Sequence, residues 1–184
     1  MAGHHVTALP ETGALYKVRF ALRKDVVEIM LDTSGDGLHK RGYRRNATLA
    51  PAAAIADLGH VRRDTFVQDP FCGSGTMVIE AAQKALNIAP GLRRRFAAEA
   101  FDFLPREVWA QERRKALEAA RMDAAFEGVG YDIVPAAVAL ATANAKLAGV
   151  EDRCRFEVAD VKDFHAMPQA VVLTNPPYGE RLGD

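Results

Sequence analysis

The sequence predicts an α/β fold with a parallel sheet, and two features of its pattern carry that prediction. From Thr65 onward, short apolar runs alternate with longer stretches of helical periodicity, which is the order of elements that produces a parallel sheet. A glycine-rich segment at residues 69–76 stands between the first apolar run and the first helical stretch. In an open sheet of this kind, ligands collect outside the carboxyl ends of the strands, at the point where the strand order reverses.

The strands and helices of this region can be assigned in order. A strand at 65–68 leads into a helix at 76–86 with small apolar side chains on one face. A long helix is expected at 106–126, with Trp109 in its apolar stripe and therefore in the core rather than stacked on a base. Later elements are a strand at 128–132, a helix at 136–147 ended by Gly149, and strands at 155–158 and 170–174.

The region before the sheet has a different pattern. Residues 15–33 contain two β-rich runs around the polar break at 23–25, which predicts a hairpin. The glycine-rich stretch that follows, at 34–45, is basic, and it is either a solvated linker or a strip that contacts phosphates. The candidate RNA-binding residues of this strip are His39, Lys40, Arg41, Arg44 and Arg45.

Composition excludes several classes of protein. The 184 residues have a net charge of zero, so the chain lacks the positive field of a self-sufficient nucleic-acid binder, and any such contact must be local. Cys72 and Cys154 lie outside CxxC spacing, which argues against a disulfide framework or a metal site. Because no long apolar run or signal peptide is present, we expect no membrane partner and a cytoplasmic location.

The glycine-rich segment is the first candidate ligand site. A P-loop is excluded because no lysine follows Gly75, and a dinucleotide site is weakened because Val78 stands where a third small residue is preferred. What remains is a ligand with a carboxylate and a ribose but no pyrophosphate, or else a turn that merely needs glycine. The candidate cofactor-binding residues here are Asp69, Phe71, Cys72, Gly73, Ser74, Gly75 and Thr76.

Two later strands end in acids. Asp132, followed by Ile133, closes the second strand, and its carboxylate could accept hydrogen bonds from both hydroxyls of a ribose. Asp160, followed by Val161, closes the third strand and could accept from an adenine amino group. Taken alone, either acid could be an ordinary exposed loop residue. Both belong to the candidate site because the carboxyl ends of parallel strands share one edge of the sheet.

The fourth strand ends in the candidate catalytic residues Asn175, Pro176, Pro177 and Tyr178. An amino group on a nucleobase is a poor nucleophile because its lone pair is delocalised into the ring. The side-chain oxygen of Asn175 and the carbonyl of Pro176 could accept its two N–H bonds, while successive prolines stiffen the backbone that aims them. Tyr178 could stack on the base. An ordinary turn is the alternative.

The segments DPFCGSGT, GYDI, ADVKDF and NPPYGERLGD together resemble the motifs of THUMP-containing RNA methyltransferases. The resemblance implies a Rossmann-like class I methyltransferase fold with strand order 3-2-1-4, whose switch point lies between the first and fourth strands. In this fold the first motif would hold the methionine part of S-adenosylmethionine. Asp132 would hold its ribose and Asp160 its adenine, Asn175 would also lie at the cofactor, and the NPPY motif would present the target amine. Members similar to this chain methylate guanine N2 in large-subunit rRNA, so RNA is the expected partner.

The resemblance also divides the chain. Residues 1–44 would be the end of a THUMP-like region with its basic linker, and 45–184 the N-terminal part of the methyltransferase domain. In the family, several residues separate an Ala-Pro pair from an alanine-rich helix, but here Ala50 and Pro51 are followed directly by the alanine-rich stretch. It is therefore in question whether a helix forms before the first strand. Later strands of the family's sheet are missing, so we expect the fragment to be weakly active or inactive. Adenine N6 methylation and a non-catalytic RNA-binding fragment are the alternatives.

Overall fold

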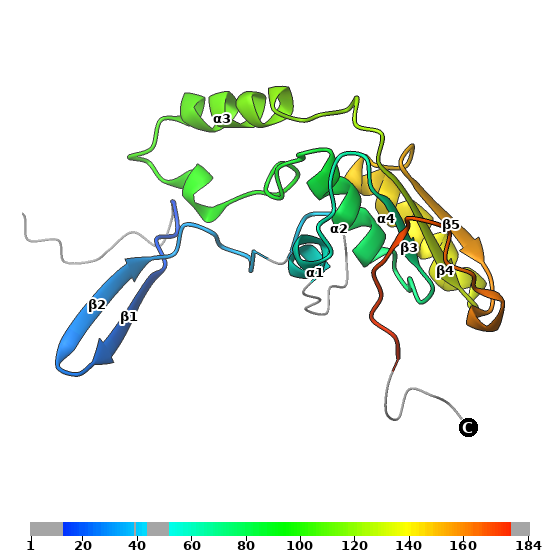
Figure 1. Cartoon of the computed structure of the whole chain (residues 1–184). Coiled ribbons are helices and arrows are strands. Elements are labelled where there is room, and N and C mark those ends of the chain that lie inside the picture. Colours follow the sequence, from blue (N-terminus) through cyan, green and yellow to red (C-terminus); the bar gives the residue numbers. More distant parts are fainter. Residues whose placement is uncertain (1–12, 39, 44–51, 178–184) are drawn as a thin grey trace, which may run out of the picture. The chain divides into compact units, whose positions relative to one another are not determined.

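The computed structural model describes residues 13–38, 40–43 and 52–177, and these form two compact units (Figure 1). The larger unit comprises His39–Arg94 and Glu112–Asp184, and the smaller one comprises Met1–Leu38 and Arg95–Gln111. Four residues of the sequence-predicted sites lie outside the described residues, namely His39, Arg44, Arg45 and Tyr178.

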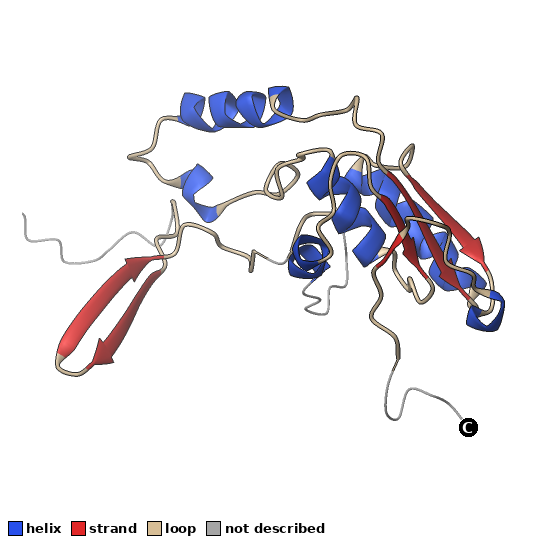
Figure 2. Cartoon of the chain, in the orientation of Figure 1, coloured by secondary structure: helices blue, strands red, loops and turns tan. Residues whose placement is uncertain are grey.

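A parallel four-stranded sheet forms the centre of the larger unit (Figure 2). Its strands are β3 (Phe66–Asp69), β4 (Glu127–Asp132), β5 (Cys154–Val158) and β6 (Val171–Val172). They run in the order β5-β4-β3-β6, which confirms the predicted order 3-2-1-4. The fourth strand is shorter than expected, although the Leu173 N–H still donates to the Gln68 carbonyl at 3.0 Å. All neighbouring strands are parallel, and with this order they form a Rossmann-like sheet.

Helices α1 (Ala52–Leu58), α2 (Thr76–Ala85) and α4 (Pro135–Ala148) complete this unit. The helix α2 lies so close to β4 that a Cβ on Gly128 would stand 2.5 Å from a methyl carbon of Val78. As predicted, α4 ends at Gly149, which adopts the left-handed conformation with φ 70°. A helix does precede the first strand of this sheet, because the alanine-rich stretch forms α1 and its Ala56 is fully buried.

The predicted long helix at 106–126 is wrong in its length and its burial. Helix α3 (Arg106–Glu118) is shorter, and none of its residues is buried. The chain leaves the helix because the Arg121 N–H donates to the Leu86 carbonyl at 2.7 Å, at the end of α2. Trp109 is half-buried and stacks on Phe96, with ring centroids 5.7 Å apart, instead of entering the core.

The smaller unit contains the predicted hairpin, β1 (Val18–Arg23) and β2 (Val26–Leu31). Its two-residue turn has positive φ at both Lys24 and Asp25, as tight hairpins require. The segment Arg95–Gln111, which includes η1 (Ala97–Ala100), belongs to this unit although it is inserted between α2 and β4. Tyr16 holds the two segments together, because its ring stacks on Phe101 with centroids 4.7 Å apart. Its hydroxyl also accepts from the Asp102 N–H at 2.9 Å.

Candidate cofactor-binding and active site

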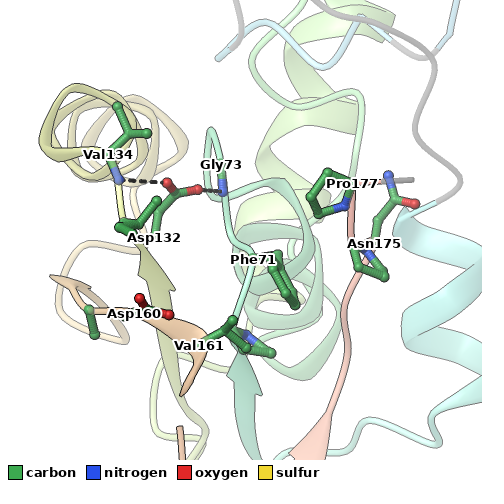
Figure 3. Close-up of a pocket in the computed structure, with 12 residues that line it drawn as sticks. Phe71, Gly73, Asp132, Val134, Asp160, Val161, Asn175 and Pro177 are labelled. Atoms are coloured by element: carbon green, nitrogen blue, oxygen red, sulfur yellow. Dashed lines mark hydrogen bonds between the residues drawn. The ribbon is translucent and has the colours of Figure 1, made fainter. Parts of the chain in front are cut away.

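A cavity of about 650 Å³ opens at the carboxyl edge of the sheet (Figure 3). All four strands of the sheet contribute to it through the segments that follow them. Its lining consists of Pro70, Phe71, Gly73, Asp132, Ile133, Val134, Ala159, Asp160, Val161, Asn175, Pro176 and Pro177. The cavity therefore lies at the switch point between β3 and β6, where the sequence places it.

The glycine loop after β3 is held in a conformation that depends on its glycines. Gly73 and Gly75 have φ of 51° and 78°, in the left-handed region that side chains disfavour. The Cys72 N–H donates to the Tyr131 carbonyl at 2.8 Å, which ties the loop to β4. A Cβ on Gly75 would stand 2.8 Å from the ring of Phe156. The backbone conformation thus favours glycine at position 73, and position 75 in addition leaves no room for a side chain.

Asp132 stands at the end of β4 and faces the cavity. One carboxylate oxygen accepts from the Gly73 N–H at 3.0 Å, and the other accepts from the Val134 N–H at 2.9 Å, as Figure 3 shows. Because each carboxylate oxygen can accept more than one hydrogen bond, both retain capacity for donors of a ligand. The two backbone bonds fix the direction in which that capacity points.

Asp160 lies beyond the end of β5, not on it. Its Oδ1 accepts from the Lys162 N–H at 2.9 Å, and the residue begins the short helix η2 (Val161–Asp163). Asp160 lies on the same side of the cavity as Asp132, with Phe71 between this side and Asn175 (Figure 3). The apolar side chains of Ile133 and Val161 are both partly exposed at the cavity.

Asn175, Pro176 and Pro177 follow β6 and are exposed at the opposite side of the cavity from the two acids. The bond from the Leu173 N–H to Gln68 fixes the point at which this segment leaves the sheet. The proline nitrogens carry no hydrogen, so the segment presents carbonyl groups and the Asn175 amide rather than a row of donors. Tyr178, the fourth candidate catalytic residue, lies outside the described residues.

Five candidate cofactor-binding residues stand behind the lining instead of forming it: Asp69, Cys72, Ser74, Gly75 and Thr76. Asp69 is buried, and its carboxylate accepts from the Phe71 N–H at 3.1 Å. Burial raises the pKa of Asp69 to about 6. Burial likewise raises the pKa of Cys72 to about 12, so that its thiol stays neutral near pH 7. These residues shape the loop rather than reach the space inside.

The basic strip makes contacts that charge alone did not predict. The Tyr43 hydroxyl donates to Glu80 Oε1 at 2.8 Å, and Arg41 Nε lies 3.4 Å from the same oxygen. Tyr43 is buried, and Glu80 belongs to α2. Part of the strip is therefore packed on α2, so it is not simply a solvated linker. RNA binding by Lys40 and Arg41 stays a prediction.

Three residues that line the cavity were not among the sequence candidates: Pro70, Val134 and Ala159. Each is the immediate sequence neighbour of a residue that the motifs predicted. No group of three possible metal-ligating side chains comes together within residues 13–38, 40–43 and 52–177. Nor, over the same part of the chain, is any helix long and apolar enough to cross a membrane.

Residues 39–184 match the family described as RMKL-like, methyltransferase domain. The chain belongs to this family. The match begins in the basic strip and includes every element of the larger unit together with the whole cavity lining. The hairpin lies outside it.

Two curated proteins that are similar in sequence to this chain are named as RNA methyltransferases. "Putative RNA methyltransferase YpsC" of Bacillus subtilis (strain 168) is 43% identical over 96% of this chain and 47% of its own length. "Ribosomal RNA large subunit methyltransferase K/L" of Syntrophotalea carbinolica is 40% identical over 91% of this chain and 26% of its own length. The chain thus spans about half of the first relative and about a quarter of the second.

Solved structures show the same fold. SMU.472, named as a methyltransferase and crystallised with SAH, aligns with a TM-score of 0.86 at 39% identity, over 95% of this chain and 47% of that one. A protein of Listeria monocytogenes named as a "predicted N6-adenine-specific DNA methylase" aligns with a TM-score of 0.85 at 42% identity, over 94% of this chain and 47% of that one.

Proposed function

We propose that the larger unit binds S-adenosylmethionine and transfers its methyl group to the exocyclic amine of a nucleobase, guanine N2 in large-subunit rRNA. One observation carries the proposal. Asn175 and the two prolines stand across a single cavity from Asp132 and Asp160, so that a cofactor held by the acids would face an amine held by the Asn-Pro-Pro segment.

The cofactor has matching groups for the residues on its side. Asp132 retains acceptor capacity for the two ribose hydroxyls, and its direction is fixed by Gly73 and Val134. Asp160 would accept from the adenine amino group, with Ile133 and Val161 against the ring faces. The methionine carboxylate would lie at the glycine loop, where α2 begins, because a helix N-terminus favours negative charge. The SAH bound to SMU.472 supports this choice of ligand.

The reaction is an in-line displacement. The lone pair of the amine forms a bond to the methyl carbon while the carbon–sulfur bond breaks, and its electrons neutralise the sulfonium. The amine becomes cationic and afterwards loses a proton. Asn175 Oδ1 and the Pro176 carbonyl would accept the two N–H bonds, which localises the nitrogen lone pair and orients it toward the methyl group. Tyr178 would stack on the base.

The choice of large-subunit rRNA is supported by the relatives named as ribosomal RNA large subunit methyltransferases, and the choice of guanine N2 rests on the family resemblance of the sequence motifs. Adenine N6 is a second candidate because a structural relative is named as an adenine-specific methylase, and the same pair of acceptors fits either amine.

We further propose that residues 1–44 form a THUMP-like end and linker and 45–184 the catalytic part. The basic strip from His39 to Arg45 would contact RNA, and an rRNA substrate would place the reaction in the cytoplasm.

Nucleoside analysis tests the proposal. The chain, alone and within its complete gene product, is incubated with unmodified rRNA and labelled S-adenosylmethionine, beside a large subunit methyltransferase K/L as reference. Digested RNA is then analysed by mass spectrometry. Labelled N2-methylguanosine supports the proposal, and N6-methyladenosine would replace guanine by adenine. If neither appears while the reference is active, the chain is not an rRNA base methyltransferase.

A further inference from the structure

We infer that Asn144 of α4 is a positioning residue for the cofactor, which it serves by fixing the glycine loop between β3 and α2. The inference rests on the proposed function in taking S-adenosylmethionine as the ligand of that loop. Asn144 does not line the cavity, and no sequence motif of the site contains it.

The contact is a part-buried hydrogen bond between distant parts of the chain, made by a buried asparagine. Asn144 Nδ2 donates to the Ser74 carbonyl at 2.9 Å, across 70 residues of sequence, and only 5% of Asn144 is exposed. A carbonyl that is partly shielded from water and loses its donor keeps part of the cost of desolvation without the compensating bond. The hydrogen bond therefore stabilises the loop in the position seen in the structure.

The bond acts on the turn that contains both positive-φ glycines. Holding the Ser74 oxygen fixes the peptide plane between Ser74 and Gly75, because the peptide group is planar. The N–H of that same peptide donates to the Cys72 carbonyl at 2.8 Å and closes the turn over Gly73. One amide of α4 thus sets the orientation of the peptide group on which the turn closes.

Packing leaves the loop little freedom to move away from α4. A Cβ on Gly75 would stand 2.9 Å from Ala141 Cβ, and Ala141 precedes Asn144 by three residues, on the same face of the helix. The loop backbone thus touches α4 at Ala141 and is hydrogen-bonded to it at Asn144. The contact and the hydrogen bond together place the loop at one position along the helix.

The turn transmits this position to the cavity. Gly73 lies within the turn, and its N–H donates to Asp132 Oδ2 at 3.0 Å. Gly73 and Asp132 both line the cavity. A change at Asn144 therefore reaches the proposed ribose acceptor through the Ser74 peptide and the Gly73 N–H, without any contact between Asn144 and the ligand.

Helix formation does not explain an asparagine at this position. Asn144 lies inside α4 between Ala143 and Ala145, and asparagine is a poorer helix former than alanine because its side chain competes for backbone hydrogen bonds. Its Nδ2 instead bonds outside the helix, to the loop. The requirement is for a donor of this length, which aspartate cannot supply at neutral pH.

The test measures SAH affinity by calorimetry for the chain and for Asn144→Asp and Asn144→Ala. Asn87→Asp is the matched control, because Asn87 Nδ2 also donates to a backbone carbonyl at 2.9 Å, that of Ala119, and the loop is not involved. We expect at least a tenfold loss of affinity for both Asn144 variants and a change below twofold for Asn87→Asp. Thermal unfolding without ligand, recorded for each variant, ensures that binding is measured well below the melting temperature.

The outcomes separate the inference from the proposed function. If the unmodified chain, folded, binds no SAH, the proposed cofactor is wrong at this site. If it binds SAH and folded Asn144 variants bind within twofold of it, Asn144 is not a positioning residue. If neither Asn144 variant folds while Asn87→Asp does, Asn144 supports the fold as a whole, and the inference is likewise overturned. In a turnover assay, the expected signature is a raised KM for S-adenosylmethionine with a smaller change in kcat.

Discussion

The backbone N–H of Gly73 donates to the carboxylate of Asp132, 59 residues later in the chain, at a distance of 3.0 Å. This bond joins the loop that follows β3 to the end of β4, so the proposed holders of the methionine and ribose parts of the cofactor form one connected structure. A change in either residue is therefore expected to affect both parts of the cofactor site.

Asp132→Ala should weaken binding of S-adenosylmethionine by roughly 5- to 150-fold. The variant removes the proposed acceptor of the ribose hydroxyls, and leaving such groups unsatisfied in the complex costs about 1–3 kcal/mol. It also removes the partner of the Gly73 N–H, which loosens the loop. Isothermal titration calorimetry measures the change, with Asp152→Ala, an exposed acid outside this cavity, as control. Equal affinities for the two variants would remove Asp132 from the site.

Asn175→Ala should abolish turnover while cofactor affinity stays nearly unchanged. The proposed contribution of Asn175 is to the reacting amine in the transition state, so its loss should appear in kcat more than in cofactor binding. Tyr178→Ala should mainly weaken capture of the base. Methyl transfer to rRNA is measured beside cofactor titrations, and Asn87→Ala removes an amide elsewhere as control. Normal turnover by Asn175→Ala would contradict the proposed mechanism.

Tyr43→Phe and Glu80→Ala should both destabilise the larger unit. Removing the Tyr43 hydroxyl deletes a buried bond to a carboxylate, worth about 1.5–3 kcal/mol, and Glu80→Ala removes the acceptor shared by Tyr43 and Arg41. Asp57→Asn breaks the ion pair with Lys84, in which the Asp57 side chain is 71% exposed, and should cost less than about 1 kcal/mol. Urea unfolding compares the three. Equal costs for the exposed and buried pairs would show that the strip is not anchored through Glu80.

The parts of the site that follow strand ends could be predicted from sequence. Apolar runs that stop at Asp69 and Asp132 mark the carboxyl ends of strands, and parallel strands bring those ends to one edge, so the acids and the Asn175 segment meet without any knowledge of side-chain contacts. The hairpin followed from local patterns, whereas the strand order, which the structure confirms, came from the family resemblance.

What sequence could not show depends on contacts between distant segments. Asn144 reaches Ser74 across 70 residues, and Tyr43 finds Glu80 across 37, so neither pairing leaves a local pattern. From the sequence, the basic strip could be interpreted by its charge alone. Its buried acidic partner, Glu80, lies in α2, far from the strip in the sequence. Trp109 was assigned to the core from helical spacing, but the chain leaves α3 at Glu118, and Trp109 stacks instead on Phe96, which precedes the helix.

Asp69 should make the stability of the chain depend on pH between about 4 and 6. Burial raises the pKa of this carboxyl from 3.8 to about 6, so over that range the folded state holds a proton that the unfolded state has released. The free energy of unfolding therefore contains a contribution that is complete below pH 4, falls as pH rises to about 6, and is absent above it. Each pKa unit corresponds to about 1.4 kcal/mol.

Asp69→Asn isolates that contribution, because asparagine keeps an oxygen for the Phe71 N–H and cannot ionise. Unfolding is measured with urea at several pH values for the chain, for Asp69→Asn and for Asp152→Asn. The difference in unfolding free energy between Asp69→Asn and the unmodified chain cancels the titration of every other group. That difference should rise in favour of the variant by about 3 kcal/mol between pH 4 and pH 7. The exposed control should show almost no such rise, and a flat difference for Asp69→Asn as well would mean that the carboxyl of Asp69 is ionised in the folded chain throughout this range.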